Sequence, residues 1–219
     1  MSSPADYQPH LDQLTAWASA EPRKPELLAA KQDYFQLTGE IYEDDKAFEM
    51  RMASFLEYYL FDRVLDASGK SAARTYFEER VRAGAPDAER DALRAFTETI
   101  HGLFEVRKLA KDHVRLRELF SAKEFDVTER RQMAGLEKGD IIEARLVPFR
   151  GELLFSAAFC FHPKAASKSI LREVKRRKKK EPHRSPSDLA WDCSKRALKA
   201  DRYRQIAIEK IYDFENKTI

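Results

Sequence analysis

The sequence is short of glycine, of cysteine and of long apolar runs. Seven glycines and two cysteines occur in 219 residues. So little glycine favours helices with charged outer faces over one large sheet. The cysteines have no metal-type spacing and are too few for a disulfide framework. The longest apolar stretch, residues 153–161, falls well short of the roughly 20 residues that cross a bilayer. The first ten residues lack the pattern of a signal peptide. We therefore expect a cytoplasmic protein that does not bind or cross a membrane.

Catalytic and cofactor motifs are missing as well. The chain has no phosphate-binding glycine loop, no GxSxG, no GxGxxG and no HExxH. We therefore predict no catalytic residue, no metal ligand, no cofactor and no small-molecule substrate. The nearest exception is Cys160 with His162, two residues apart on one strand face, where a thiol could meet a base. Without a third orienting residue in view, a buried structural thiol is the favoured interpretation.

What the chain does have is charge, distributed unevenly. Charged residues make up 35% of it, above the usual quarter, and the net charge is only +3. Residues 1–60 hold 5 basic and 11 acidic side chains, whereas residues 164–219 hold 17 basic and 8 acidic ones. Such a gradient suggests a charged partner or a head-to-tail contact between copies.

Periodicity divides the chain into two kinds of segment. Residues 1–9, polar and with two prolines, are expected to be disordered, and residues 10–100 show the spacing of several helices. From residue 101 to 163 the pattern alternates, which predicts five short strands in a small antiparallel barrel of the SH3-like or OB-like kind. A basic helix over 164–181 and a final helix over 187–216 complete an α+β protein.

Two stretches together resemble a group of uncharacterised bacterial proteins, some of which carry a SEC-C zinc motif elsewhere. An aromatic-rich helix ending in Phe-Asp precedes a barrel strand of the form Gly-Asp…Ala-Arg-Leu-x-Pro. The matching residues here are Phe61, Asp62, Gly139, Asp140, Ala144, Arg145, Leu146 and Pro148. The resemblance covers residues 45–163 and implies the helix-then-barrel layout, with no known activity. A SEC-C motif needs a cysteine cluster near the C-terminus, where only Cys193 stands.

The strongest functional signal is an unbroken run of six basic residues, 175–180. We predict that it binds phosphates of DNA or RNA without sequence preference, because phosphate contacts carry no sequence information. The predicted nucleic-acid-binding residues are Lys168, Arg172, Lys175, Arg176, Arg177, Lys178, Lys179, Lys180 and Arg184. Two other interpretations stay open: a solvated helix end that suits the helix dipole, and a site for an acidic protein.

The barrel offers a weaker second surface. Arginines expected to point outward (Arg107, Arg115, Arg117 and Arg145) lie among the aromatic residues Phe104, Phe120 and Phe125. Barrels bind single strands with such groups. Glutamates alternate with the arginines, however, and cross-strand ion pairs are the favoured explanation. His101 and His113 could also meet across the first hairpin.

The sequence thus predicts a non-enzymatic nucleic-acid-binding protein that uses residues 164–184. The alternative is an adaptor or self-assembly protein, in which the C-terminal helices bind another protein or a second copy. Trp191, Tyr203, Ile206 and Phe214 would then supply the apolar contacts.

Overall fold

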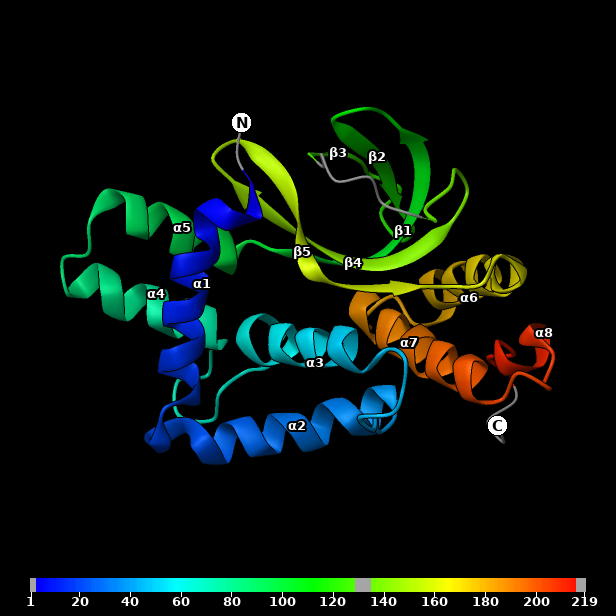
Figure 1. The fold of residues 1–219 in the computed structure, drawn as a ribbon, viewed down its shortest axis with the longest axis horizontal. Helices are drawn as coiled ribbons and strands as arrows, with labels where there is room; N and C mark the ends of the chain where they lie inside the picture. The colour runs from blue at the N-terminus through cyan, green and yellow to red at the C-terminus, as the bar shows by residue number, and fades with distance from the viewer. Residues whose placement is uncertain (1–2, 129–134, 216–219) are drawn as a thin grey trace. The chain divides into compact units, whose positions relative to one another are not determined.

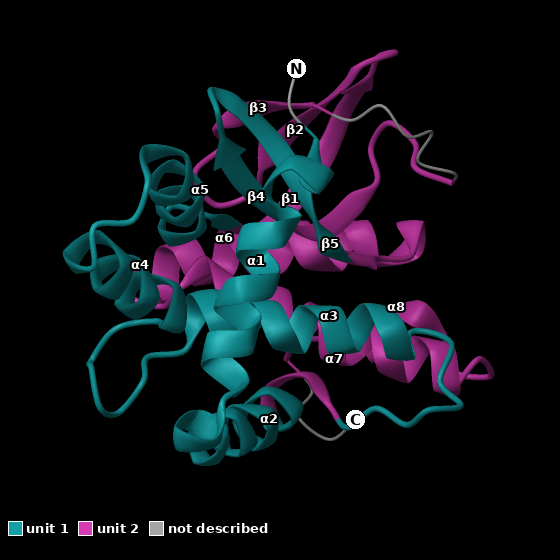
Figure 2. Cartoon of the chain, turned by 60° about the vertical axis from the view of Figure 1, so that its left-hand side comes forward, with its two compact units in different colours: residues 1–36, 40–100, 145–158 teal, residues 37–39, 101–144, 159–219 magenta. Residues whose placement is uncertain are grey.

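The structure, a computed structural model, describes residues 3–128 and 135–215. It is an α+β protein with helices on both sides, in sequence, of a five-stranded barrel (Figure 1). The predicted fold class is confirmed. The chain divides into two compact units (Figure 2). Unit 1 holds residues 1–36, 40–100 and 145–158, and unit 2 holds residues 37–39, 101–144 and 159–219.

Unit 1 is built mainly from the N-terminal helices. In chain order these are α1 (Pro4–Ser19), the short η1 (Glu21–Arg23), α2 (Lys24–Thr38), α3 (Phe48–Glu57), the π-helical η2 (Tyr58–Asp62), α4 (Ala72–Arg82) and α5 (Asp87–Thr97). Helices α4 and α5 form a close pair, which α1 contacts (Figure 1). Helix α4 starts where Ser71 accepts a hydrogen bond from the Arg74 backbone N–H, an ordinary N-cap.

Helix α1 begins earlier than the sequence suggested. The expectation of a disordered stretch over residues 1–9 is wrong from Pro4 onward. Proline suits the first turn of a helix, and the Asp6 carboxylate accepts a hydrogen bond from the Ser3 backbone N–H at 2.6 Å. Tyr7 is buried, with its ring edge-on to Phe96 and Phe149. This aromatic contact orders the N-terminus. The residues around Tyr7 are polar, so the local sequence does not predict its burial.

The barrel consists of β1 (Ile100–Leu109), β2 (His113–Glu118), β3 (Glu124–Thr128), β4 (Ile141–Phe149) and β5 (Glu152–Phe161). Its strands close in the order β1-β2-β3-β5-β4. Pairing of β1 with β2 and of β2 with β3 is antiparallel, with Val106 opposite Leu116 and Val114 opposite Val127. Strand β5 thus lies between β3 and β4, so the closed barrel contains a crossover from β3 to β5.

A buried charge cluster within unit 1 corrects one prediction. Arg145 does not point outward but is 3% exposed. Its guanidinium donates to Glu57 at 3.2 Å, to Thr99 at 2.9 Å and to Asp62, and it lies 5.0 Å from the Phe61 ring. Burial acts to lower the pKa of Arg145, but Asp62 and Glu57 outweigh it and raise the pKa, so the group stays charged. Alternation along β4 cannot reveal this, because the strand is buried on both faces.

Unit 2 contains three C-terminal helices after the short η3 (Lys164–Ala166): α6 (Ser167–Lys180), α7 (Pro186–Arg202) and α8 (Ile208–Ile211). Their apolar side chains share a core with Leu103 of β1 and Ile141 of β4. Helix α6 contributes Ile170 and Val174, and α7 contributes Cys193. The basic helix therefore docks on its own chain by one face.

The final helix is shorter than predicted. The continuous helix expected over residues 187–216 is wrong, because α7 ends at Arg202 and Tyr203 leaves the helical conformation. The following residues fold back, so that Ile206 and Ile208 pack against the unit 2 core and Ile211 and Tyr212 are buried in it. A straight helix could not bring all four side chains to the same core, which explains the break.

We predict that Arg145→Ala destabilises the protein by about 3 kcal/mol, because it leaves the partly buried Glu57 and Asp62 carboxylates without their cation. The measurement is the free energy of unfolding in urea. Arg115→Ala is the control, since its ion pair with Asp126 is largely exposed and should contribute little. Equal stability of the two variants would contradict the role of the cluster.

Candidate polyanion-binding surface and its ion-pair network

Helix α6 carries its positive charge on one face and its apolar contacts on the other. Ile170 and Val174 are buried in the unit 2 core, and Glu173 and Arg177 are buried beside them. At 100° per residue, these four positions share one side of the helix. The opposite side is exposed and cationic.

We call the exposed row of Lys168, Arg172, Lys175 and Lys179 the cationic stripe. Its spacing of four, three and four residues keeps the side chains on one helix face. All four residues are exposed, as are Lys178 and Lys180 at the end of the helix. Across residues 3–128 and 135–215, none of these six cations forms an ion pair or hydrogen bond through its side chain. The stripe is therefore available to a partner.

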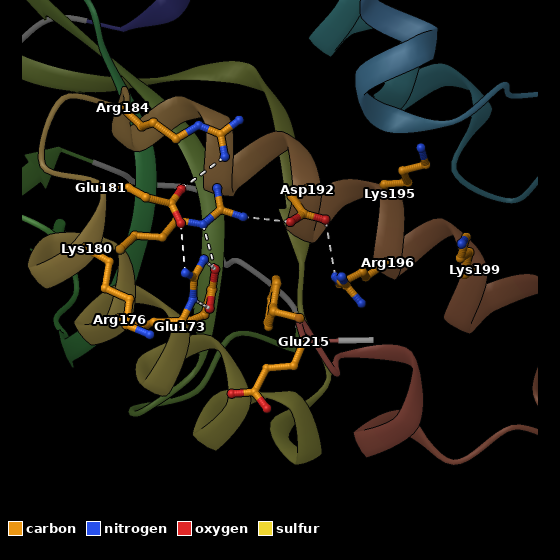
Figure 3. A pocket seen from close by; sticks show the side chains of 12 residues that line it. Glu173, Arg176, Lys180, Glu181, Arg184, Asp192, Lys195, Arg196, Lys199 and Glu215 are labelled. Carbon is orange, nitrogen blue, oxygen red and sulfur yellow. Dashed lines mark hydrogen bonds and ion pairs between the residues drawn. The ribbon is translucent and has the colours of Figure 1, made fainter. Parts of the chain in front are cut away.

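The remaining three predicted residues are arginines that serve the fold. The Arg177 Nε donates to the Glu173 carboxylate at 2.7 Å, and Arg177 Nη2 donates to Asp192 of α7 at 2.8 Å. Arg176 binds the same glutamate with two hydrogen bonds of 2.7 Å and reaches Glu181 at 2.8 Å. These contacts tie α6 to α7 through alternating charges (Figure 3).

The network extends at both ends. Arg184, after the helix, donates to Glu181 at 3.1 Å. On α7, Arg196 donates to Asp192 at 3.2 Å and to the Asp213 backbone carbonyl at 3.1 Å, while its guanidinium lies 4.3 Å from the Phe214 ring. The alternating chain, which we call the arginine network, runs through Arg184, Glu181, Arg176, Glu173, Arg177, Asp192 and Arg196 (Figure 3).

The arginine network lines a cavity of about 730 Å³ between α6 and α7 (Figure 3). Three lysines, Lys180, Lys195 and Lys199, also line it, so that seven cationic side chains face four acidic ones. Burial, together with the nearby charges of Lys195 and Arg196, lowers the pKa of Lys199. The positively charged side chains that line the cavity outnumber the acidic ones and repel one another, so the cavity is electrostatically suited to bind an anion.

The sequence did not distinguish these two groups of cations. Six of the nine predicted residues lie exposed on α6, and three are part of the arginine network. One signal was present: the paired groups are arginines, whose planar guanidinium suits two-pronged carboxylate contacts, and five of the six exposed ones are lysines. Glu173, embedded in the basic helix, was the second signal.

The barrel surface offers less than predicted. Arg115 pairs with Asp126 on the next strand at 2.8 Å, a cross-strand ion pair whose acid is not one of the glutamates on which the prediction rested. Arg107 pairs with Glu105 at 2.9 Å. Phe104 is fully buried and packs edge-on against Phe125, so it presents no face for a base. These arginines are largely neutralised and poorly suited to bind phosphates.

The Cys160–His162 pair does acquire a third residue. Glu143, from β4, lies with both, and one ligand atom from each residue falls within 4.8 Å of the others. Glu143 is one of the glutamates that alternate with the arginines, which were expected to point outward, yet it is buried. His101 binds Glu143 at 3.0 Å and His113 binds Asp112 at 2.9 Å, so the predicted approach of these two histidines is wrong.

Comparison with known proteins adds a family. A family model described as a family of unknown function, DUF7986, matches residues 30–191, well over half of the chain. The chain belongs to DUF7986. The matched range includes the whole barrel and α6, together with Glu143, Cys160 and His162. No curated protein and no solved structure matches the chain. Membership therefore assigns no activity, and the resemblance to bacterial helix-plus-barrel proteins stays a prediction. In residues 3–128 and 135–215, no helix is long and apolar enough to cross a membrane.

The arginine network predicts a pH dependence of stability. Burial acts to raise the pKa of Glu173, but hydrogen bonds from Arg176 and Arg177 outweigh it and hold the pKa below the ordinary value of 4.5. A carboxyl whose pKa is lowered by folding stabilises fully above its unfolded pKa, and that contribution is lost as the pH falls through the folded pKa. The wild-type protein should therefore lose stability as the pH falls below about 4.5, the ordinary pKa of a glutamate.

Glu173→Gln should flatten the plot of unfolding free energy against pH below about pH 4.5, because the glutamine side chain does not titrate. The measurement is urea unfolding at a series of pH values, with Glu209→Gln, an exposed change in α8, as the control. The control should follow the wild-type curve. A Glu173→Gln curve parallel to wild type would show that the network does not stabilise through this carboxylate.

Proposed function

We propose that this DUF7986 protein is a non-enzymatic, cytoplasmic protein that binds nucleic acid without sequence preference through the cationic stripe of α6. The observation that carries the proposal is the division of the basic helix into two populations. The three arginines of the predicted site are neutralised by acidic partners. The four cations of the stripe, and Lys178 and Lys180 at the end of the helix, have no acidic partner among the described residues.

The dimensions of the cationic stripe suit a phosphate backbone. From Lys168 to Lys179 the helix rises about 16 Å, at 1.5 Å per residue. Phosphates of one DNA strand rise 3.4 Å apiece, so the stripe spans the rise of about five of them. Four to six contacts of this kind would give a log–log salt slope of about −4 to −5 on duplex DNA. The affinity would come mainly from counterion release.

The helix also bears an electrostatic cost that a polyanion would relieve. Lys168 and Arg172, and likewise Lys175 and Lys179, are like charges four residues apart, each pair costing about 0.2–0.5 kcal/mol in an isolated helix. Glu173 compensates on the buried face only, where it contacts Arg176 and Arg177. Bound phosphates would neutralise the exposed face.

The adaptor or self-assembly alternative has less support in the structure. It needs the apolar side chains of the C-terminal helices to face a partner. Ile206 and Phe214 instead pack against the core of their own unit, and Trp191 stacks on His101 with ring centroids 5.9 Å apart. Only Tyr203 of that set is exposed, at 47%. One exposed aromatic residue is a small basis for a stable interface.

The test is fluorescence anisotropy of labelled duplex DNA, single-stranded DNA and RNA across a salt series. The variant replaces Lys168, Arg172, Lys175 and Lys179 by glutamine, which preserves helix propensity. We expect the wild type to bind in the micromolar range or tighter, and to lose roughly 250- to 1,000-fold in affinity between 50 and 200 mM salt. The variant should bind far more weakly, with its salt slope reduced by about 3 to 4.

A matched control separates the stripe from net charge. Glutamine at Lys108, Lys111, Lys123 and Lys138 removes the same charge from exposed positions of unit 2 outside α6. This control should bind almost as the wild type does. Equal losses of affinity in both variants would show that binding depends on overall charge and not on the stripe. The absence of binding by the wild type at low salt would refute the proposal. In that case light scattering against protein concentration would test self-assembly.

A further inference from the structure

We propose that Glu143, Cys160 and His162 form a zinc-binding site in unit 2. Their ligand atoms, a carboxylate oxygen, a thiol sulfur and an imidazole nitrogen, all lie within 4.8 Å of one another. Glu143 and His162 are buried, and Cys160 is partly buried. Sulfur, nitrogen and oxygen donors together match the preferences of Zn²⁺. The inference is independent of what α6 binds.

The topology of the barrel explains how residues 17 and more positions apart in sequence come together. Glu143 lies near the start of β4, and Cys160 lies near the end of β5. The His162 backbone N–H donates to the Ile141 carbonyl at 3.2 Å, which fixes the end of β5 beside the start of β4. Cys160 and His162, two residues apart in an extended chain, share a face.

Charge balance is compatible with a bound dication. A thiolate and a carboxylate this close in a buried place would repel each other, and a bound dication would offset that repulsion when the thiol gives up its proton. Zn²⁺ bound by the Cys160 thiolate, the Glu143 carboxylate and a neutral His162 gives a complex with no net charge. Binding releases the thiol proton to solvent, so the proton balance is closed.

Neighbouring side chains hold Glu143 and His162 in place by hydrogen bonds. His162 Nδ1 lies 3.1 Å from the Tyr212 hydroxyl, so Nε2 is the nitrogen that would bind the metal. His101 Nε2 lies 3.0 Å from a Glu143 carboxylate oxygen, and the Ser194 hydroxyl donates to the other. Such contacts orient ligands in known metal sites, and a carboxylate oxygen has a second lone pair for the ion.

One of the three candidate ligands borders open space. A cavity of about 390 Å³ is lined by His162 together with Glu137, Asp140 and Lys164, and Lys164 pairs with Glu137. Three protein ligands leave a fourth zinc position for water, as in sites that keep an open position. The cavity therefore brings solvent close to His162.

The experiment uses the full chain, stripped of metal under reducing conditions and reconstituted with Zn²⁺ or Co²⁺. Bound zinc is quantified per chain by elemental mass spectrometry after dialysis. Bound Co²⁺ is detected by its thiolate-to-metal charge-transfer band and its d–d absorption bands. We expect one metal per chain and a thiolate band in the wild type. Cys160→Ser should abolish the band, and His162→Gln should release zinc on dialysis.

The only other cysteine provides the control. Cys193 is fully buried and outside the cluster, so Cys193→Ala should keep both the zinc and the band. Circular dichroism of each variant identifies any loss of fold. The cobalt absorption spectrum of the wild-type protein tests for thiolate coordination without any variant. Wild-type protein that retains no zinc, or a cobalt–thiolate band that survives Cys160→Ser, would overturn the proposal.

Discussion

The contact of Glu173 with Arg177, closed by Asp192 of α7, is the interaction on which the position of the basic helix depends. Both Glu173 and Arg177 are buried, so each would be a costly charge without the other. Because Arg177 also reaches α7 at 2.8 Å, the pair fixes the rotation of α6 about its own axis. Once that rotation is fixed, Lys168, Arg172, Lys175 and Lys179 face away from the unit 2 core.

Apolar packing and charge act together in this arrangement. Ile170 and Val174 hold the first half of α6 on the core, and the arginine network holds the second half, where no apolar residue follows Val174. A run of six cations would otherwise leave the helix end without any docking contact. Arginine fills the paired positions and lysine most of the exposed ones, in line with their different geometry and hydration.

Much of the fold could be predicted from the sequence, because it depends on local patterns. Alternation over residues 101–163 indicated the strands, and helical spacing over residues 10–100 indicated the N-terminal helices. What could not be predicted depends on long-range contacts. Tyr7 orders the N-terminus through rings of Phe96 and Phe149, and Arg145 is buried by carboxylates more than 80 residues away. Local polarity assigns such residues to the surface, which is why these predictions failed.

The same distinction applies to the candidate sites. Six exposed cations of α6 were identified from composition alone, but the sequence could not show that Arg176, Arg177 and Arg184 find acids on α6, α7 and the connection between them. Cys160 and His162 were recognised as a pair from their spacing. Glu143 joins them only through the closure of the barrel, which no spacing in the sequence encodes.

Binding of DNA by the cationic stripe is tested most directly by the reactivity of each lysine toward an amine-labelling reagent, with and without saturating DNA, read residue by residue by mass spectrometry. We expect strong protection of Lys168, Lys175 and Lys179, and unchanged labelling of Lys108, Lys111 and Lys123 on the barrel. Protection centred on the barrel lysines, or equal protection at all positions, would contradict it.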